Sequence, residues 1–286
     1  MISLQSFIEI GFSQNQVGIA SCTISSMYDD TCRFLAENFS ADFASWLLGK
    51  SVTLTELKPS ELSLDPIRAD ALILLESDES VLHLEFQTRP KRDIPFRMLD
   101  YRVRVYRRYP DKEMRQVVVY LQPTGSDLVR QNSFALERTR HEFDIVCLWE
   151  QPAEVFLQYP GLLPFAALGQ SADAEATLRQ VAQTVDQITD STIQANLTAA
   201  SAILAGIKLE EEVIYRLLRR DIMQESVIYR SIQREAETRA ETRKQREIAT
   251  NSLREGLPIE IVARVTGLSI EEVQQLQKQL NESAQN

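Results

Sequence analysis

The chain has 286 residues, of which 44% are hydrophobic and 25% charged, a composition typical of a globular protein. Its formal net charge of −10 excludes a protein that coats nucleic acid through bulk positive charge. No apolar run approaches the ~18–20 residues of a membrane span. The first 26 residues carry no Lys or Arg, so we expect no secretory signal, no membrane partner and a cytoplasmic location.

The N-terminal part of the sequence divides into an unpatterned and a patterned stretch. Residues 1–26 show no clear hydrophobic period, and we expect a peripheral N-terminal extension there. Apolar side chains then recur at helical spacing over 28–48, and Gly49 follows as a stop signal, which predicts a helix. Apolar and polar residues alternate over 51–57, which predicts a strand.

A polar turn joins two apolar stretches, residues 69–75 and 81–88, and this arrangement predicts a β-hairpin. If the turn centres on residues 77–78, Asp70 lies opposite Glu85. Opposed Cβ atoms on paired strands are ~4.5–5.5 Å apart. The hairpin therefore predicts that the two carboxylates reach one divalent ion.

Asp70, Glu85 and Gln87 are candidate catalytic residues, with Asp70 and Glu85 as the metal ligands. Glu85 and Gln87 project from the same face of an otherwise apolar strand. Two carboxylates, with waters and a substrate phosphate, are a common way to hold Mg²⁺, and we expect Mn²⁺ to substitute. Gln87 would orient the attacking water or a metal ligand. Solvated acids near strand ends are an alternative interpretation, because a Glu-x-Gln tripeptide is common.

The cysteine and histidine content favours carboxylate ligands for any metal. The three cysteines show no Cys-x-x-Cys spacing and are interpreted as reduced thiols. Two histidines are too few for a zinc site of the His/Cys type. We expect a carboxylate-bound metal and no organic cofactor.

The pattern of residues 94–109 predicts an amphipathic helix. This helix lies within the basic segment 89–115, which has ten Arg or Lys against four acids and so a net charge of +6. Its apolar stripe is predicted to consist of Phe96, Leu99, Val103 and Tyr106. A different face is predicted to bind DNA phosphates through Arg97, Tyr101, Arg104 and Arg108. The alternative is a basic face that is simply solvated.

Further strands are predicted at 115–121, 133–138 and 143–149, and they complete an expected domain of residues 27–150. After it we expect a helical region, a charged long helix and a helix-turn-helix-like pair, at residues 151–208, 209–250 and 251–286. The repeat AETR-AETR in the long helix fits either a solvated helix with Glu–Arg pairs or a dimerising coiled coil.

The C-terminal helix pair has Ala263, Gly267 and Val273 at the spacing of a helix-turn-helix. Its second helix carries Glu271 and Glu272 but only one lysine, whereas a recognition helix for DNA is normally more basic. Both a DNA-reading role and a packing or self-association role stay open for this pair.

Several stretches together resemble the Rpn-type recombination-promoting nuclease/transposase family, within the PD-(D/E)xK nuclease superfamily. They are MYDDTCRFLAENFSADFASWLLG, PIRADALILLES, LHLEFQT, IPFRMLDYRVRVYRRYP and VVVYL, within residues 27–150. The resemblance implies an α/β fold with a PD-(D/E)xK restriction-endonuclease-like αβββαβ core, followed by a mainly helical C-terminal region. It implies metal ligands at Asp70 and Glu85, and an acid on the first helix, with Glu37 as the candidate and Asp30 behind it.

The resemblance implies a Mg²⁺-dependent endodeoxyribonuclease that hydrolyses DNA phosphodiester bonds, linked to recombination or transposition. The sequence departs from the superfamily at Gln87, where lysine would bring a positive charge beside the nucleophile. A catalytically inactive DNA-binding or interaction scaffold with a nuclease-like fold is the alternative. We also expect a homodimer, because two copies are the simplest way to cut both strands with one active site per chain.

Overall fold

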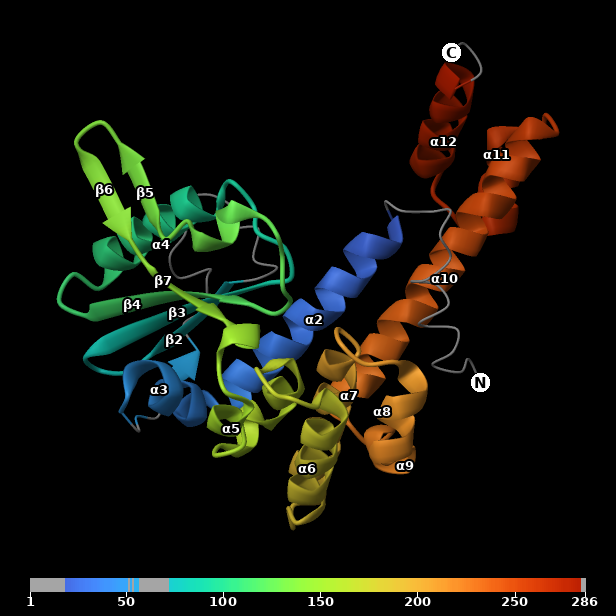
Figure 1. The fold of residues 1–286 in the computed structure, drawn as a ribbon. Helices are drawn as coiled ribbons and strands as arrows, with labels where there is room; N and C mark the ends of the chain where they lie inside the picture. The colour runs from blue at the N-terminus through green and yellow to red at the C-terminus, as the bar shows by residue number, and fades with distance from the viewer. Residues whose placement is uncertain (1–18, 51, 53, 57–71, 284–286) are drawn as a thin grey trace. The chain divides into compact units, whose positions relative to one another are not determined.

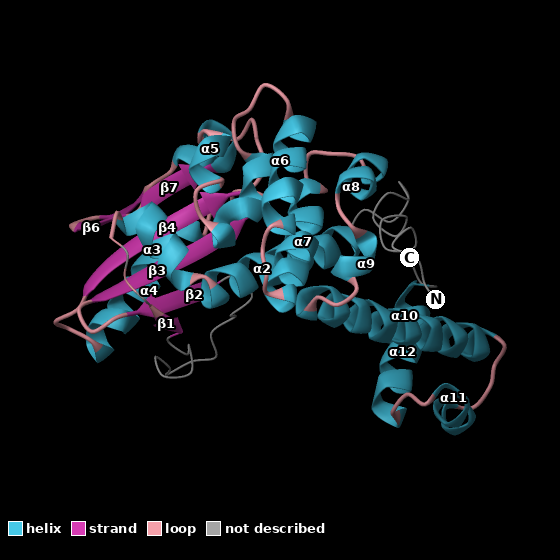
Figure 2. Cartoon of the chain, turned by 90° about the horizontal axis from the view of Figure 1, so that it is seen from below, coloured by secondary structure: helices cyan, strands magenta, loops and turns pink. Residues whose placement is uncertain are grey.

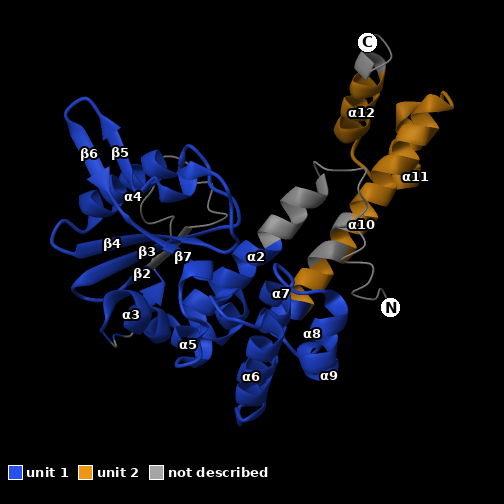
Figure 3. Ribbon diagram, viewed as in Figure 1, with its two compact units in different colours: residues 1–229 blue, residues 230–286 orange. Residues whose placement is uncertain are grey.

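The computed structural model describes residues 19–50, 52, 54–56 and 72–283 (Figure 1). The chain forms two compact units, residues 1–229 and residues 230–286, and each is described by itself (Figure 3). The boundaries that we expected at residues 150 and 208 fall inside the first unit. Within the described part of the chain, no helix is long and apolar enough to cross a membrane.

A five-stranded mixed sheet forms the centre of the first unit, in the order β1-β2-β3-β4-β7 (Figure 1). Strands β1, β2 and β3 pair antiparallel, whereas β4 is parallel to both β3 and β7. The five strands span Thr55–Glu56, Leu72–Glu76, Ser80–Gln87, Glu113–Tyr120 and Asp144–Cys147. Helix α4, Ile94–Arg108, provides the crossover that the parallel pair β3–β4 needs. The prediction of an α/β protein is confirmed.

A separate two-stranded sheet precedes β7. It pairs β5, Ser133–Leu136, with β6, Thr139–Glu142. The strand predicted over 133–138 ends earlier than expected, because Glu137 adopts a positive φ of 48° and makes the turn. β6 was not predicted, since its sequence TRHE has no apolar alternation.

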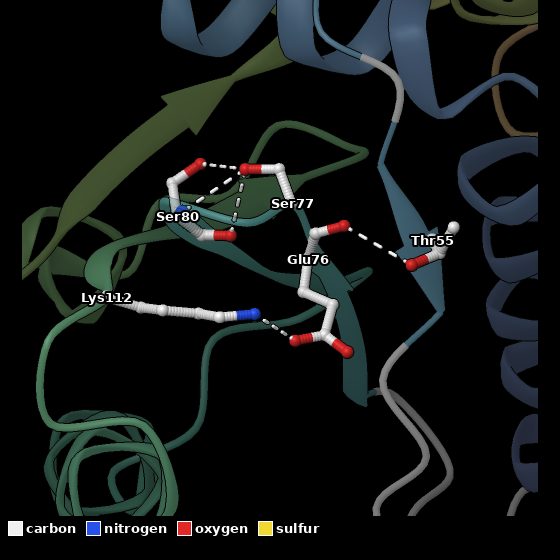
Figure 4. Close-up of polar contacts among 5 residues, drawn as sticks. All are labelled: Thr55, Glu76, Ser77, Ser80 and Lys112. Atoms are coloured by element: carbon white, nitrogen blue, oxygen red, sulfur yellow. Dashed lines mark hydrogen bonds and ion pairs between the residues drawn. The ribbon is translucent and has the colours of Figure 1, made fainter.

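The turn between β2 and β3 gives the hairpin a different register from the predicted one. Ser77 donates its backbone N–H to the Ser80 carbonyl at 2.8 Å, and the two hydroxyl oxygens lie 3.0 Å apart (Figure 4). The turn centres one residue later than predicted, so Leu72 and not Asp70 pairs with Glu85. The predicted register was therefore wrong by two residues. Side chains alternate between the two faces of a strand, so an error of two residues in the register leaves Glu85 on the predicted face.

Polar contacts tie the end of β2 to its neighbours (Figure 4). The Thr55 hydroxyl on β1 donates to the Glu76 carbonyl at 3.4 Å. Lys112, which follows α4, forms an ion pair with the Glu76 carboxylate. These contacts hold the turn end of the hairpin, while Glu85 lies near the other end of β3.

The helix predicted over 28–48 consists of two helices. α2 spans Ile19–Asn38 and α3 spans Ser40–Leu48, and Phe39 between them leaves the helical conformation with φ −126° and ψ 37°. Gly49 ends α3 in the left-handed conformation, as predicted. α2 begins eight residues before the boundary that we expected between the N-terminal extension and the first domain.

Helices cover both faces of the sheet (Figures 1 and 2). On one face, Val81 of β3 packs against Tyr101 and Val105 of α4. On the other face, Phe43 of α3 meets Phe86 of β3 edge-on, with ring centroids 6.3 Å apart. The two faces of β3 therefore look into two different cores.

The apolar stripe predicted for α4 was wrong. Phe96 and Tyr106 are 56% and 57% exposed. The side chains that face the sheet are Ile94, Met98, Tyr101 and Val105. Both stripes recur at helical spacing, so hydrophobic periodicity did not distinguish them.

The chain after residue 150 contributes to the same core. The 3-10 helix η4, Pro160–Leu168, is buried from its second residue onward, and Phe165 stacks on Phe86 with centroids 5.8 Å apart. Gly161 donates its backbone N–H to the Asp42 carboxylate of α3 at 2.8 Å. The region expected as a separate helical segment therefore completes one side of the sheet.

The remaining helices of the first unit follow the sheet in the chain. Asp173 and Asp190 each accept two backbone N–H groups and so cap α6 and α7. The bounds of α5 to α9 are Ala153–Phe156, Ala174–Asp186, Ser191–Ala205, Glu211–Leu217 and Arg220–Met223. Two short 3-10 helices, η2 and η3, span Asp127–Arg130 and Leu148–Glu150.

The second unit begins at Arg230 and contains most of α10, Val227–Arg254. It also contains α11, Ile259–Thr266, and α12, Ile270–Ser283. Its core contains Ala249, Val262, Leu268 and Val273. Gly267 has a φ of 75° and makes the tight turn between α11 and α12, so the predicted helix pair is confirmed.

Candidate functional site

The candidate site lies on the face of β3 that α4 covers. His83, Glu85 and Gln87 alternate along this face, and all three are buried. β3 is the middle strand of the sheet, so neighbours on both sides shield these side chains from water. Buried polar groups need partners, and the partners define the site.

Glu85 makes both of its observed contacts through one oxygen. Gln87 Nε2 donates to Glu85 Oε1 at 3.1 Å. Arg97 Nη2, from α4, lies 3.3 Å from the same oxygen. Glu85 Oε2 is buried and has no hydrogen-bond partner among the residues that the structure describes.

Burial raises the pKa of Glu85 from 4.5 to about 7. Arg97 and Lys91 oppose this rise, because positive charges favour the carboxylate. Asp93 and Asp29 add to it through like-charge repulsion. The carboxyl group thus lies among two cations and two anions, and is poised to change its charge near neutral pH.

The acids of the first helix have different surroundings. Asp29 of α2 raises the pKa of Glu85. Glu37 is half-buried, and its own pKa is raised by burial and by Glu56 and lowered by Arg33, which places it beside β1. Asp30 is exposed on the same helix. Asp70, the other predicted metal ligand, lies outside the described residues.

The four residues predicted to bind DNA phosphates have different surroundings. Tyr101 is only 6% exposed, and its ring packs edge-on against His83 at 5.2 Å, so it belongs to the core. Arg97 contacts Glu85. Arg104 pairs with Asp100 at 2.9 Å, and Arg108 is exposed. The four side chains therefore do not form one exposed face, because the side of α4 that carries Tyr101 meets the sheet.

A second polar cluster, which the sequence did not reveal, continues the site along the sheet. Gln116 Nε2 donates to the Met98 carbonyl and to His83 Nδ1, both at 2.8 Å. His141 Nε2 donates to Gln116 Oε1 at 2.7 Å. Because Gln116 uses its N–H groups as donors, His83 Nδ1 must accept, and the ring carries its hydrogen on Nε2. Burial lowers the pKa of His83 to about 3 and keeps it neutral.

A divalent cation fits Glu85 in one respect. The buried, unpartnered Oε2 is an oxygen of the kind that Mg²⁺ and Mn²⁺ prefer. Within the described residues, no group of three or more His, Cys, Asp or Glu side chains is arranged to hold a metal. The fit therefore depends on a second carboxylate, for which Asp70 is the candidate.

Comparison of the chain with models of protein families, with curated proteins and with solved structures gives no match.

Proposed function

We propose that the chain is a Mg²⁺- or Mn²⁺-dependent endodeoxyribonuclease of the Rpn type, with a PD-(D/E)xK site on β3 and a link to recombination or transposition. The observation that carries the proposal is the buried Glu85 carboxylate, whose Oε2 has no hydrogen-bond partner in the described part of the chain. A buried carboxylate oxygen without a hydrogen bond is costly, and a bound cation would remove that cost.

The order of the elements supports the same proposal. Helices α2 and α3 precede three antiparallel strands, and α4 then leads to the parallel strand β4. This order is compatible with the αβββαβ core that the resemblance implies. In that order the Glu-x-Gln segment falls on the third strand, with the following helix directly over it.

Glu85 and Asp70 would hold the metal, and Gln87 would orient the groups around it. When bound, the ion supplies Lewis-acid stabilisation of the phosphate and lowers the pKa of a bound water. Gln87 Nε2 already restrains Glu85 Oε1. Asp29 adds a further negative charge that would favour a cation at this position.

DNA would approach over the exposed side of α4. The segment 89–115 has a balance of +6, and Arg107 and Arg108 are exposed there. Arginine is suited to backbone phosphates because its guanidinium binds two phosphate oxygens at once. We keep the homodimer as part of the proposal, because duplex cleavage would need two such sites.

A non-catalytic scaffold is the second candidate function. The neutral Gln87 in the position of the usual lysine favours it, because no positive charge stands on β3 beside Glu85. This candidate predicts DNA or protein binding that is independent of divalent metal.

Cleavage of supercoiled plasmid tests the two candidates against each other. With Mg²⁺ or Mn²⁺ we expect nicking by the wild type, and loss of nicking with EDTA, in Glu85→Gln and in Asp70→Asn. Glu79→Gln, an exposed acid in the β2–β3 turn, is the matched control and should cleave normally. A well-folded wild type that leaves the plasmid intact with either metal would favour the scaffold.

A further inference from the structure

A positive charge reaches Glu85 from α4 and not from its own strand. Gln87, two residues further along β3, contributes a neutral amide at 3.1 Å from Glu85 Oε1. The guanidinium of Arg97 contributes a full charge at 3.3 Å from the same atom. Arg97 therefore brings a positive charge close to Glu85, although β3 has no lysine there.

The packing of α4 fixes the place of Arg97. Ile94, Met98 and Tyr101 lie close to it along the helix and are buried against the sheet. Arg97 lies among them on the same side of α4, with 23% of its side chain exposed, while the side chain of Glu85 is fully buried. A charge that is partly withdrawn from water acts more strongly on its neighbours than a solvated one.

The contacts of Glu85 leave its two oxygens unequal. Arg97 and Gln87 both engage Oε1, whereas Oε2 is buried and meets no hydrogen-bond donor among the described residues. A hydrogen bond from Gln87 and an ion pair with Arg97, both on one oxygen, restrain the rotation of the carboxylate. The orientation of the other oxygen, Oε2, is thereby fixed as well.

We propose that Arg97 takes the place of the superfamily lysine and supplies the positive charge beside the reacting phosphate. This inference rests on the proposed nuclease function. It adds that the charge needed at the site has moved from the strand β3 to the helix α4.

This role predicts opposite effects on metal binding and on cleavage. A guanidinium repels a divalent cation, so its removal relieves repulsion at the metal site. Its removal also takes away a charge that would stabilise the phosphate in the transition state. A purely structural arginine would instead lower metal affinity and cleavage together, because its loss would leave Glu85 misplaced.

The test compares Arg97→Met with Arg97→Lys and with the control Arg179→Met, whose arginine lies on α6 and pairs with Glu175 instead of Glu85. Mn²⁺ affinity is measured by electron paramagnetic resonance on full-length protein without DNA, and plasmid nicking is measured separately. We expect Arg97→Met to bind Mn²⁺ at least as tightly as the wild type and to nick about 100-fold more slowly. Arg97→Lys should recover part of the rate, and Arg179→Met should match the wild type.

Four outcomes decide between these possibilities. Nicking at the wild-type rate by Arg97→Met overturns the inference, and so does a parallel loss of nicking and Mn²⁺ affinity. A wild type that binds no Mn²⁺ and nicks no plasmid removes the proposed function itself, and with it the basis of the inference. Tight Mn²⁺ binding with slow nicking, partly restored by lysine, supports the inference.

Discussion

Burial shifts the pKa values of two side chains on β3 in opposite directions. The pKa of Glu85 is raised to about 7, and the pKa of His83 is lowered to about 3. Burial disfavours the charged form in both cases, so both groups are neutral in the metal-free chain between about pH 3 and pH 7. In the unfolded chain at pH 5 to 6, the carboxylate would be ionised and the imidazole protonated. Their contributions to the pH dependence of stability therefore oppose each other in this range.

Replacement of Glu85 by glutamine should stabilise the metal-free chain at high pH. The raised pKa of Glu85 means that its contribution to stability is fully present below pH 4.5 and is lost as the pH rises through about 7. The gain from Glu85→Gln should be larger at pH 8 than at pH 5, by about 2 kcal/mol in the free energy of unfolding. Urea denaturation in EDTA at the two pH values measures it. An equal effect at both would mean that Glu85 ionises normally.

Replacement of His83 by asparagine should have the opposite pH dependence. The amide oxygen of asparagine can still accept from Gln116, but it does not titrate. The lowered pKa of His83 means that its contribution is present above pH 6.5 and is lost as the pH falls towards 3. The disadvantage of His83→Asn relative to the wild type should shrink by about 2 kcal/mol between pH 7.5 and pH 5. A constant difference across this range would show that His83 becomes protonated in the folded chain.

The sequence allowed Glu85 and Gln87 to be placed together in the candidate site, but not their neighbours on α4 and α2. Alternation along residues 81–88 was enough to place Glu85 and Gln87 on one face of a strand. The contact with Arg97 and the influence of Asp29 depend on how α4 and α2 dock on the sheet. Docking is a tertiary property that hydrophobic periodicity does not encode.

Many of the predicted strands and helices exist, but the long helix expected over 209–250 is divided into α8, α9 and α10. The other errors mainly concern how the elements face and pair. The register of the β2–β3 hairpin depends on hydrogen bonds between Ser77 and Ser80, which a composition-based turn prediction did not resolve. The predicted buried face of α4 was wrong because the exposed residues Phe96 and Tyr106 also recur at helical spacing. Tyr101 lies between arginines in the sequence and was therefore predicted to be on the surface. The aliphatic part of an arginine side chain can pack beside the core, so arginines do not reliably mark the exposed face of a helix.

The close approach between η4 and the α2–α3 corner gives a prediction at the same scale. A Cβ at Gly161 would lie 2.2 Å from Phe39 Cβ, so Gly161→Ala would force the two elements apart. We expect a decrease of about 1–3 kcal/mol in the free energy of unfolding. Gly125→Ala, where a Cβ meets nothing within 4 Å, is the matched control. Equal denaturation midpoints for the two variants would contradict the packing of η4 against this corner.

At the scale of the whole molecule, the charge is unevenly distributed. Residues 230–286 carry nine Arg or Lys and nine Glu, so the second unit is neutral in sum. The segment 89–115 has a balance of +6 within a first unit that holds the full net charge of −10. Attraction of DNA through phosphate charge is therefore expected at α4 and not at the second unit.

Paired substitutions test this distribution. Arg107→Gln with Arg108→Gln should weaken DNA binding and reduce the slope of log affinity against log salt by about 1 to 2, because each arginine would neutralise about one phosphate. Arg243→Gln with Arg246→Gln, two exposed arginines of α10 in the second unit, is the matched control and should leave the slope unchanged. Fluorescence anisotropy with a labelled duplex over a salt series gives both values. A larger effect of the α10 pair would move the DNA-binding surface to the second unit.

The most direct test of the account is a crystal structure of the full chain soaked with Mn²⁺, with data collected for anomalous scattering. The account predicts an anomalous peak within bonding distance of Glu85 Oε2, and disappearance of that peak in Glu85→Gln crystals. Crystals that hold Mn²⁺ elsewhere, or that leave Glu85 Oε2 without it at a concentration that supports cleavage, would contradict the central claim that Glu85 is a metal ligand.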